Sequence, residues 1–172
     1  MEIWDLYTKN RTLSGKTHIR GEMIPEGYYH LVVHIWIKNS KGEYLISQRA
    51  ASRPTCPLMW ECVGGSVIAG ESSLEGAIRE VKEEVGLNLA PMSGKLIYSV
   101  IGRVHDGVPF NDILDVWLFH YDGDVSLTNA TTDEVAQVKW MTPSKIKELL
   151  ERGKLVNTLA YFFTEIEQST EG

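Results

Sequence analysis

The stretch GSVIAGESSLEGAIREVKEEVGL, residues 65–87, decides how the rest of the chain is interpreted. Its second half predicts a helix over 72–85, because apolar residues recur there at helical spacing. A polar stripe runs along the other side, since residues three and four apart are neighbours on a helix surface. That stripe carries three acidic residues, Glu80, Glu83 and Glu84. The apolar stripe consists of Leu74, Ala77, Ile78, Val81 and Val85.

The ends of this helix are marked by their own residues. Ser72 and Glu75 form a capping-box pattern at the start, and Gly86 stands where a helix stop belongs. Like charges four residues apart destabilise a helix by roughly a few tenths of a kcal/mol. A bound cation would offset that cost, whereas the simpler interpretation is an acidic helix face exposed to water.

The carboxylates match the chemistry of a hard cation. Mg²⁺ takes carboxylate oxygens and keeps several waters for a phosphate partner. Just before the helix, Gly64 and Gly65 allow the backbone to pass close to a ligand and offer carbonyl oxygens. The residues therefore predict a metal-lined floor beside a glycine turn.

The whole stretch 65–87 resembles the Nudix box, G-x5-E-x7-R-E-U-x-E-E-x-G-U with U aliphatic, and all nine specified positions match. The resemblance implies a Nudix fold, an α/β/α sandwich with a mixed sheet. It also implies hydrolysis of a small molecule in which a nucleoside diphosphate is linked to another group, by attack of water on a phosphorus of the diphosphate, assisted by Mg²⁺ or Mn²⁺. The order of expected strands and helices on both sides is similar to that of the family.

The resemblance assigns expected roles to individual residues. The metal ligands would be Glu80 and Glu84, with Glu83 as a further ligand and the Gly64 carbonyl beside them. Arg79 would hold the glutamate cluster in place through Glu71. The general base would be Glu83 or Glu84, with the loop residue Glu134 as the next candidate. The remaining residues of the motif are structural: Gly65, Glu71 and Gly86.

Composition sets the boundaries of the interpretation. The chain has 172 residues and a formal net charge of −6, which disfavours a general nucleic-acid binder. Two cysteines, Cys56 and Cys62, make neither a disulfide framework nor a zinc spacing, so we expect a reducing, cytoplasmic location. We expect no signal peptide and no membrane span, because no apolar run is long enough.

The remaining elements predict one domain over 1–172, with 1–28 as an N-terminal strand and extension and 143–172 as C-terminal helices. Residues 10–17 look like a turn, and 43–49 looks like the hairpin partner of the strand before it. The expected strands lie at 2–8, 29–38, 43–49, 61–65, 95–104, 113–121 and 136–141. The expected helices after 72–85 are 143–153 and 155–167.

Substrate-binding residues are less well marked. Arg49 could meet a phosphate through a bidentate contact, with Arg53 and Arg103 as weaker candidates. Asp115 stands in an apolar strand and needs a partner or a pocket. The other candidates are Glu61 and the face of the strand 29–38 that carries His34 and Trp36, although packing alone would also explain that face.

Two alternative functions and one assembly state stay open. Residues 15–50 resemble the N-terminal part of isopentenyl-diphosphate isomerase, which uses the same fold for a proton-transfer reaction that relies on a cysteine. Here Gly64 and Ser66 occupy the positions of the isomerase cysteine and histidine, and Cys62 is two residues out of place. The second alternative is a non-catalytic ligand-sensing module, although the complete box disfavours it. A homodimer is also possible.

Overall fold

Strand β3 (Tyr29–Lys38) is the centre of the molecule in the computed structural model, which describes residues 1–168. Of the expected C-terminal segment 143–172, residues 169–172 lie outside the described part. The strand is rich in β-branched and aromatic residues, which favour extended backbone. Its alternate residues Val33, Ile35 and Ile37 are fully buried on one face, and Trp36 is fully buried on the other. Helical segments therefore have to cover both faces of this strand.

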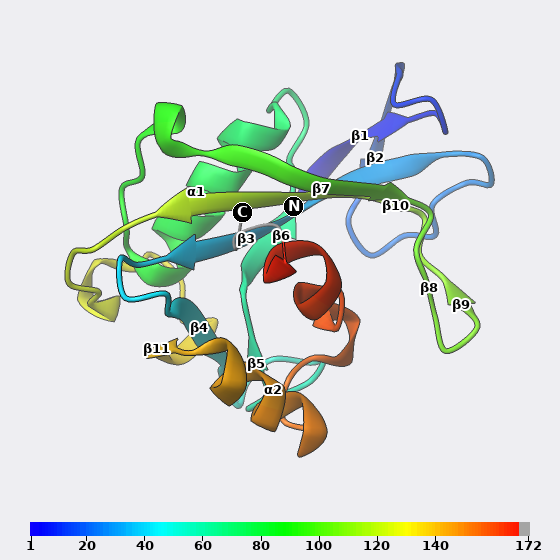
Figure 1. Cartoon of the computed structure of the whole chain (residues 1–172). Helices are drawn as coiled ribbons and strands as arrows, with labels where there is room; N and C mark the ends of the chain where they lie inside the picture. The colour runs from blue at the N-terminus through cyan, green and yellow to red at the C-terminus, as the bar shows by residue number, and fades with distance from the viewer. Residues whose placement is uncertain (169–172) are drawn as a thin grey trace.

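The two edges of β3 are paired differently (Figure 1). On one edge β10 runs parallel to it over the whole length, and β7 follows β10 in antiparallel orientation. On the other edge β1, β6 and β4 pair with it one after another, all antiparallel. The sheet is therefore mixed, as expected. The bounds of these strands are β1 (Ile3–Tyr7), β4 (Tyr44–Arg49), β6 (Val63–Ser66), β7 (Lys95–Ile101) and β10 (Asp112–His120).

Further strands extend this frame. A hairpin joins β1 to β2, and β4 pairs with β5 and with β11. A separate two-stranded hairpin, β8 with β9, projects from the sheet. The bounds are β2 (Leu13–Ile19), β5 (Trp60–Glu61), β8 (Val104–His105), β9 (Val108–Pro109) and β11 (Val135–Met141).

Helices lie on both sides of the sheet and produce the α/β/α arrangement (Figure 1). Helix α1 (Ser73–Val85) packs on one face with Val33, Ile35 and Ile113. Helix α2 (Pro143–Glu151) and the C-terminal turns pack on the other face with Trp36 and Val116. The C-terminal turns are Asn157–Leu159 and Phe162–Ile166. Two short 3-10 turns occupy Pro91–Ser93 and Leu127–Asn129.

The predicted helix over 72–85 is confirmed, with Ser72 as its N-cap. The Ser72 hydroxyl accepts a hydrogen bond from the backbone NH of Glu75, whose carboxylate accepts one from the backbone NH of Ser72. At the other end Gly86 adopts the left-handed conformation, with φ 73°. The capping pattern therefore fixes both ends of the helix that carries the glutamates.

Three local expectations differ from the structure. Residues 43–49 do not form a full hairpin with β3, because β4 pairs with it only at Lys38 and Tyr44 while β6 occupies the next part of that edge. The turn expected over 10–17 is shorter, since β2 already begins at Leu13. The segment 155–167 is helical only in short 3-10 and π turns. Among residues 1–168 no helix is long and apolar enough to cross a membrane.

Gly86→Ala should destabilise the protein more than Gly153→Ala does. Both glycines have positive φ, 73° and 64°, so each alanine meets backbone strain of about 1 kcal/mol. Only at Gly86 would the new Cβ also meet backbone, 2.7 Å from the carbonyl carbon of Asn129; at Gly153 nothing lies within 4 Å. Urea unfolding followed by tryptophan fluorescence compares the two, and equal losses of unfolding free energy would contradict the close approach at Gly86.

Candidate functional site

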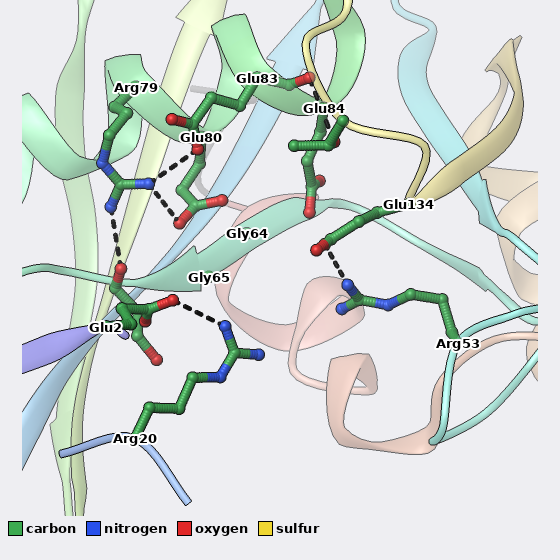
Figure 2. Close-up of a pocket in the computed structure, with 12 residues that line it drawn as sticks. Glu2, Arg20, Arg53, Gly64, Gly65, Arg79, Glu80, Glu83, Glu84 and Glu134 are labelled. Carbon is green, nitrogen blue, oxygen red and sulfur yellow. Dashed lines mark hydrogen bonds and ion pairs between the residues drawn. The ribbon is translucent and has the colours of Figure 1, made fainter.

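A cavity of about 130 Å³ opens beside β6, on the edge of β3 that three strands share (Figure 2). The polar side of α1 contributes three glutamates to it, and loops before β5 and before β11 contribute Arg53 and Glu134. The hairpin of β1 and β2 supplies the flanking residues Glu2 and Arg20. The complete lining is Glu2, Arg20, Arg53, Gly64, Gly65, Ser66, Arg79, Glu80, Glu83, Glu84, Thr132 and Glu134.

Arg79 ties the glutamates of this cavity together. Its guanidinium donates to Glu71 at 2.9 Å, to Glu80 at 2.9 Å and to Glu83 at 3.1 Å. It also donates to the carbonyl oxygen of Ser66 at 2.9 Å. Burial works to lower its pKa, but the bonds to Glu71 and the charge of Glu80 outweigh burial and raise the pKa above its ordinary value. Arg79 is therefore a permanent cation that joins the loop after β6 to α1.

Glu80 and Gly65 are fitted to each other. A Cβ on residue 65 would lie 2.4 Å from Oε1 of Glu80, so a larger residue there would push that carboxylate out of its position. Burial raises the pKa of Glu80, although the charge of Arg79 opposes the shift. The glycine within β6 therefore serves a steric purpose, which is to let a carboxylate lie against the backbone.

Gly64 is restricted by β3 itself. It pairs with His34 in the antiparallel register, and a Cβ there would lie 2.5 Å from the carbonyl oxygen of Val33. A side chain at 64 would therefore collide with backbone, which cannot move aside as a flexible side chain can. The double glycine brings bare backbone to the cavity wall.

Glu84 is the least satisfied residue of the cavity. Its side chain is buried, with 4% of the residue exposed, and within residues 1–168 its Oε2 has no hydrogen-bond partner. Burial raises its pKa well above the ordinary value, and the negative charges of Glu80, Glu61 and Glu134 act in the same direction. A buried carboxylate without a partner is costly, so proteins pair it or let it bind a metal ion.

These observations test whether the residues suit a divalent cation. In the described residues no three Asp, Glu, His or Cys side chains already lie close enough to hold an ion. Arg79 accounts for part of this, because it occupies one oxygen of Glu80 and one of Glu83. The donor set nevertheless fits: it has carboxylate oxygens, adjacent glycine backbone and one orphaned buried oxygen on Glu84.

Glu134 reaches the cavity because its loop is attached to α1. The backbone NH groups of Thr131 and Thr132 donate to the carbonyl oxygen of Glu83, at 2.9 and 3.2 Å. Glu134 forms an ion pair with Arg53, and both line the cavity. The second base candidate thus lies in the same cavity as the helix glutamates.

Two expected substrate ligands, Arg49 and Glu61, lie outside this cavity. Arg49 is buried and donates to Glu61 at 2.7 Å and to the carbonyl and hydroxyl of Thr55 at 2.9 and 3.1 Å. Its guanidinium holds the loop between β4 and β5 instead of facing open space. Burial raises the pKa of Glu61, although Arg49 opposes this. The weaker candidate, Arg53, is the arginine of this loop that lines the cavity.

His34 and Trp36 lie on the face of β3 opposite α1, and neither is among the residues that line the cavity. Both contact the hydroxyl of Tyr161, His34 through Nδ1 at 2.8 Å and Trp36 as donor at 3.0 Å. Burial lowers the pKa of His34 to about 3, and the positive charge of Arg103 acts in the same direction, so the imidazole is neutral at pH 7. These two side chains are satisfied packing residues that orient Tyr161.

Asp115 is paired with an arginine and does not line the cavity. It is fully buried, and its carboxylate accepts two hydrogen bonds from Arg11, at 2.6 and 2.8 Å, and one from Ser99 at 2.7 Å. Arg103 is engaged similarly with Asp112, at 2.5 Å. The apolar strand β10 thus carries two buried aspartates whose charges are matched by arginines from other elements.

Sequence reasoning missed Glu2 and Arg20 altogether. Both belong to the ends of the β1–β2 hairpin, and their backbones pair directly, with the NH of Arg20 donating to the carbonyl of Glu2 at 3.0 Å. Nothing local in the sequence predicts this placement. It depends on β1 pairing with β3 next to β6, which only the sheet topology reveals.

Comparison with known proteins places this geometry in a family. The model of the NUDIX domain matches residues 28–163. An uncharacterized Nudix hydrolase of Listeria innocua is 38% identical over 164 residues, 95% of this chain and 91% of its own length. Isopentenyl-diphosphate isomerase I of Camptotheca acuminata matches at 29% over 153 residues, 78% of this chain and 63% of its own.

Solved structures agree with the fold. DR0079 from Deinococcus radiodurans aligns with TM-score 0.71 at 21% identity, covering 90% of this chain and 92% of its own. A bifunctional NMN adenylyltransferase/ADP ribose pyrophosphatase from Francisella tularensis, complexed with AMP and a Mn ion, aligns with TM-score 0.60 at 22% identity, covering 84% and 42%. With the domain match and the close relative of nearly equal length, the chain belongs to the Nudix hydrolase family.

Proposed function

We propose that this protein is a divalent-metal-dependent pyrophosphohydrolase that cleaves the diphosphate linkage of a nucleoside-diphosphate compound by attack of water on phosphorus. The observation that carries the proposal is the buried carboxylate of Glu84, whose Oε2 has no partner among the described residues and which shares a cavity with Glu80 and Glu83. Ordinary packing gives no reason for such a group, whereas a cation supplies one.

The ligands of the ion would be the carboxylates of Glu80 and Glu84, with Glu83 and the backbone of Gly64 beside them. A bound Mg²⁺ or Mn²⁺ would neutralise charge on the diphosphate and make water a better nucleophile at neutral pH. Arg79 keeps Glu80 and Glu83 in position through its bonds to both. Glycine at 65 lets the carboxylate of Glu80 lie against the backbone, and glycine at 64 lets β6 pair closely with β3.

A general base has to take the proton of the attacking water. Glu83 and Glu84 are the first candidates, since both line the cavity from α1. Glu134 is the second, and its bond with Arg53 means that it is held in place but also partly neutralised. All three are carboxylates that line the same cavity, which supports each of them as a proton acceptor.

A second cavity supports a substrate with a planar group. It has about 240 Å³ and includes the aromatic residues Tyr98, Phe110 and Tyr161, with Arg103 lying 5.3 Å over the Phe110 ring. His34 lies between residues of the two cavities: its backbone pairs with Gly64 of the first, and its Nδ1 contacts the hydroxyl of Tyr161 of the second. Aromatic walls with one cation suit a nucleobase. Solved neighbours with AMP or ADP ribose bound favour the same class.

The isomerase alternative is disfavoured by Cys62. The thiol is buried in the core beside Trp36, with 3% of the residue exposed. Burial raises its pKa well above the ordinary value, with help from the charges of Glu61 and Glu84, so it stays protonated at pH 7. A protonated thiol in the core is a poor acid–base group for a substrate in the cavity.

Turnover should depend on metal and on Glu84. We expect formation of a nucleoside monophosphate from nucleoside-diphosphate compounds with Mg²⁺ or Mn²⁺ and none in chelator. Glu84→Gln should lower kcat at least about 100-fold while the fold is kept, because a charged ligand of the metal ion is lost. A screen of such compounds by chromatography of the nucleotide products measures this, with the exposed Glu151→Gln as control. Wild-type turnover in purified Glu84→Gln would refute the metal site.

The same substitution should stabilise the metal-free protein at pH 7. Because burial raises the folded-state pKa of Glu84 above 4.5, the folded chain gives up stability as the pH rises from that value toward the raised pKa. Glutamine removes the buried charge, so we expect a gain of about 1–3 kcal/mol in unfolding free energy at pH 7. Urea unfolding in chelator measures it, and a stability equal to or below that of wild type would show that the carboxylate is already compensated.

Cys62→Ala separates the hydrolase from the isomerase. The hydrolase proposal expects turnover of the diphosphate compound within about threefold of wild type, since Cys62 lies in the core and does not line the cavity. Conversion of isopentenyl to dimethylallyl diphosphate is assayed in parallel. Isomerase activity in the wild type that Cys62→Ala abolishes, with a normal circular dichroism spectrum, would revive the alternative; tight ligand binding without any turnover would favour the sensing module.

A further inference from the structure

Arg20 reaches the cavity from a part of the chain that lies outside the matched domain. The NUDIX match begins at residue 28, whereas Arg20 follows β2 of the N-terminal hairpin. Arg20 is among the residues that line the cavity, and in Figure 2 its guanidinium lies below Gly65, on the side opposite the glutamates of α1. The hairpin therefore adds a cation to a site that the domain alone leaves without one on this side.

The hairpin that carries Arg20 is firmly attached. Trp4 stacks on His30 of β3 with ring centroids 4.2 Å apart, and its indole NH donates to Glu2 at 2.6 Å. The carbonyl of Ile3 accepts from Ala69 at 2.8 Å, in the segment between β6 and α1. Arg20 thus directly follows a strand of the sheet, and its hairpin is bonded to the same loop that Arg79 holds, which gives it a defined position relative to the glutamates.

The charges of the cavity show which arginines are available to an anion. Five carboxylates and three arginines line it. Arg79 is fully engaged by Glu71, Glu80, Glu83 and Ser66. Arg20 has one partner among the described side chains, Glu2 at 2.7 Å, and 55% of its side chain is exposed. Its remaining N–H groups face water and are free to bind a phosphate oxygen.

We propose that Arg20 is a substrate-binding residue that grips an outer phosphate oxygen of the diphosphate, on the side of the cavity opposite the metal-binding carboxylates. This rests on the proposed function, since it takes the same substrate. Glu2 holds the guanidinium in place in the free protein and competes with the phosphate for it. Glu2 has a second donor, Trp4, so its carboxylate stays bonded when Arg20 turns to the substrate.

A matched surface pair allows the effect to be isolated. Arg152 donates to Glu148 at 2.9 Å, its side chain is 61% exposed, and it lies at the end of α2 and does not line the cavity. An exposed pair of this kind contributes little to stability. Arg152→Gln therefore controls for the loss of one surface charge, and Arg20→Lys tests whether any cation suffices.

The experiment measures the affinity of the full-length chain for methylenediphosphonate, a diphosphate that water cannot cleave, by calorimetry with Mn²⁺ present. Mn²⁺ binding without the diphosphonate is measured separately by electron paramagnetic resonance.

We expect Arg20→Gln to weaken the affinity for the diphosphonate about tenfold or more, because a charge-assisted bond is lost, and to leave Mn²⁺ binding unchanged. Arg20→Lys should recover part of the affinity, and Arg152→Gln should match wild type. Glu2→Gln should bind as tightly as wild type or more tightly, since the competitor is removed.

The outcomes separate this inference from the proposed function. Affinity of Arg20→Gln within twofold of wild type, or no diphosphonate binding by wild type, overturns it. An equal loss of diphosphonate affinity in Glu2→Gln also overturns it, because the Arg20–Glu2 pair would then only stabilise the local structure. If the chain binds the diphosphonate through Arg20 but hydrolyses no nucleoside-diphosphate compound, the inference survives and the proposed function fails. If the chain hydrolyses nucleoside-diphosphate compounds and Arg20→Gln has the same KM as wild type, the proposed function stands and the inference about Arg20 fails.

Discussion

The guanidinium of Arg79 is the contact on which the site depends. It joins Glu71 and the Ser66 carbonyl, before the helix, to Glu80 and Glu83 on the helix. Carboxylates this close would repel each other, and the planar cation with several donors balances them at fixed angles. It also satisfies a backbone carbonyl where β6 ends. One side chain thereby sets the distance between the end of β6 and the acidic face of α1.

The second constraint is the edge of β3. Because β1, β6 and β4 pair with successive parts of one edge, segments far apart in sequence meet beside Gly64 and Gly65. The N-terminal hairpin contributes Arg20, the loop before β5 contributes Arg53, and the loop before β11 contributes Glu134. A cavity lined from both sides and roofed by a helix follows directly from this pairing (Figure 2).

Sequence predicted what depends on local patterns. The helix over 72–85 could be predicted because its caps, Ser72 and Gly86, and its apolar spacing lie within fifteen residues, and the glutamates could be predicted from their spacing. Arg49 and Asp115 were placed less well, since their partners are set by tertiary contacts: Asp115 pairs with Arg11, 104 residues away. Arg20 lay beyond prediction for the same reason. A charged residue in an apolar strand indicates that a partner is needed, but only the tertiary structure identifies that partner.

Glu84 shows how the structure and the function are linked. Burial and the charges of three neighbouring carboxylates disfavour the ionised form of its side chain. This lowers the stability of the protein alone but favours the binding of a cation. The most direct measurement is a crystal structure with Mn²⁺ and anomalous diffraction. The account predicts a peak roughly 2.0–2.4 Å from oxygens of Glu80 and Glu84. Ordered carboxylates with no peak between them at saturating Mn²⁺ would contradict it.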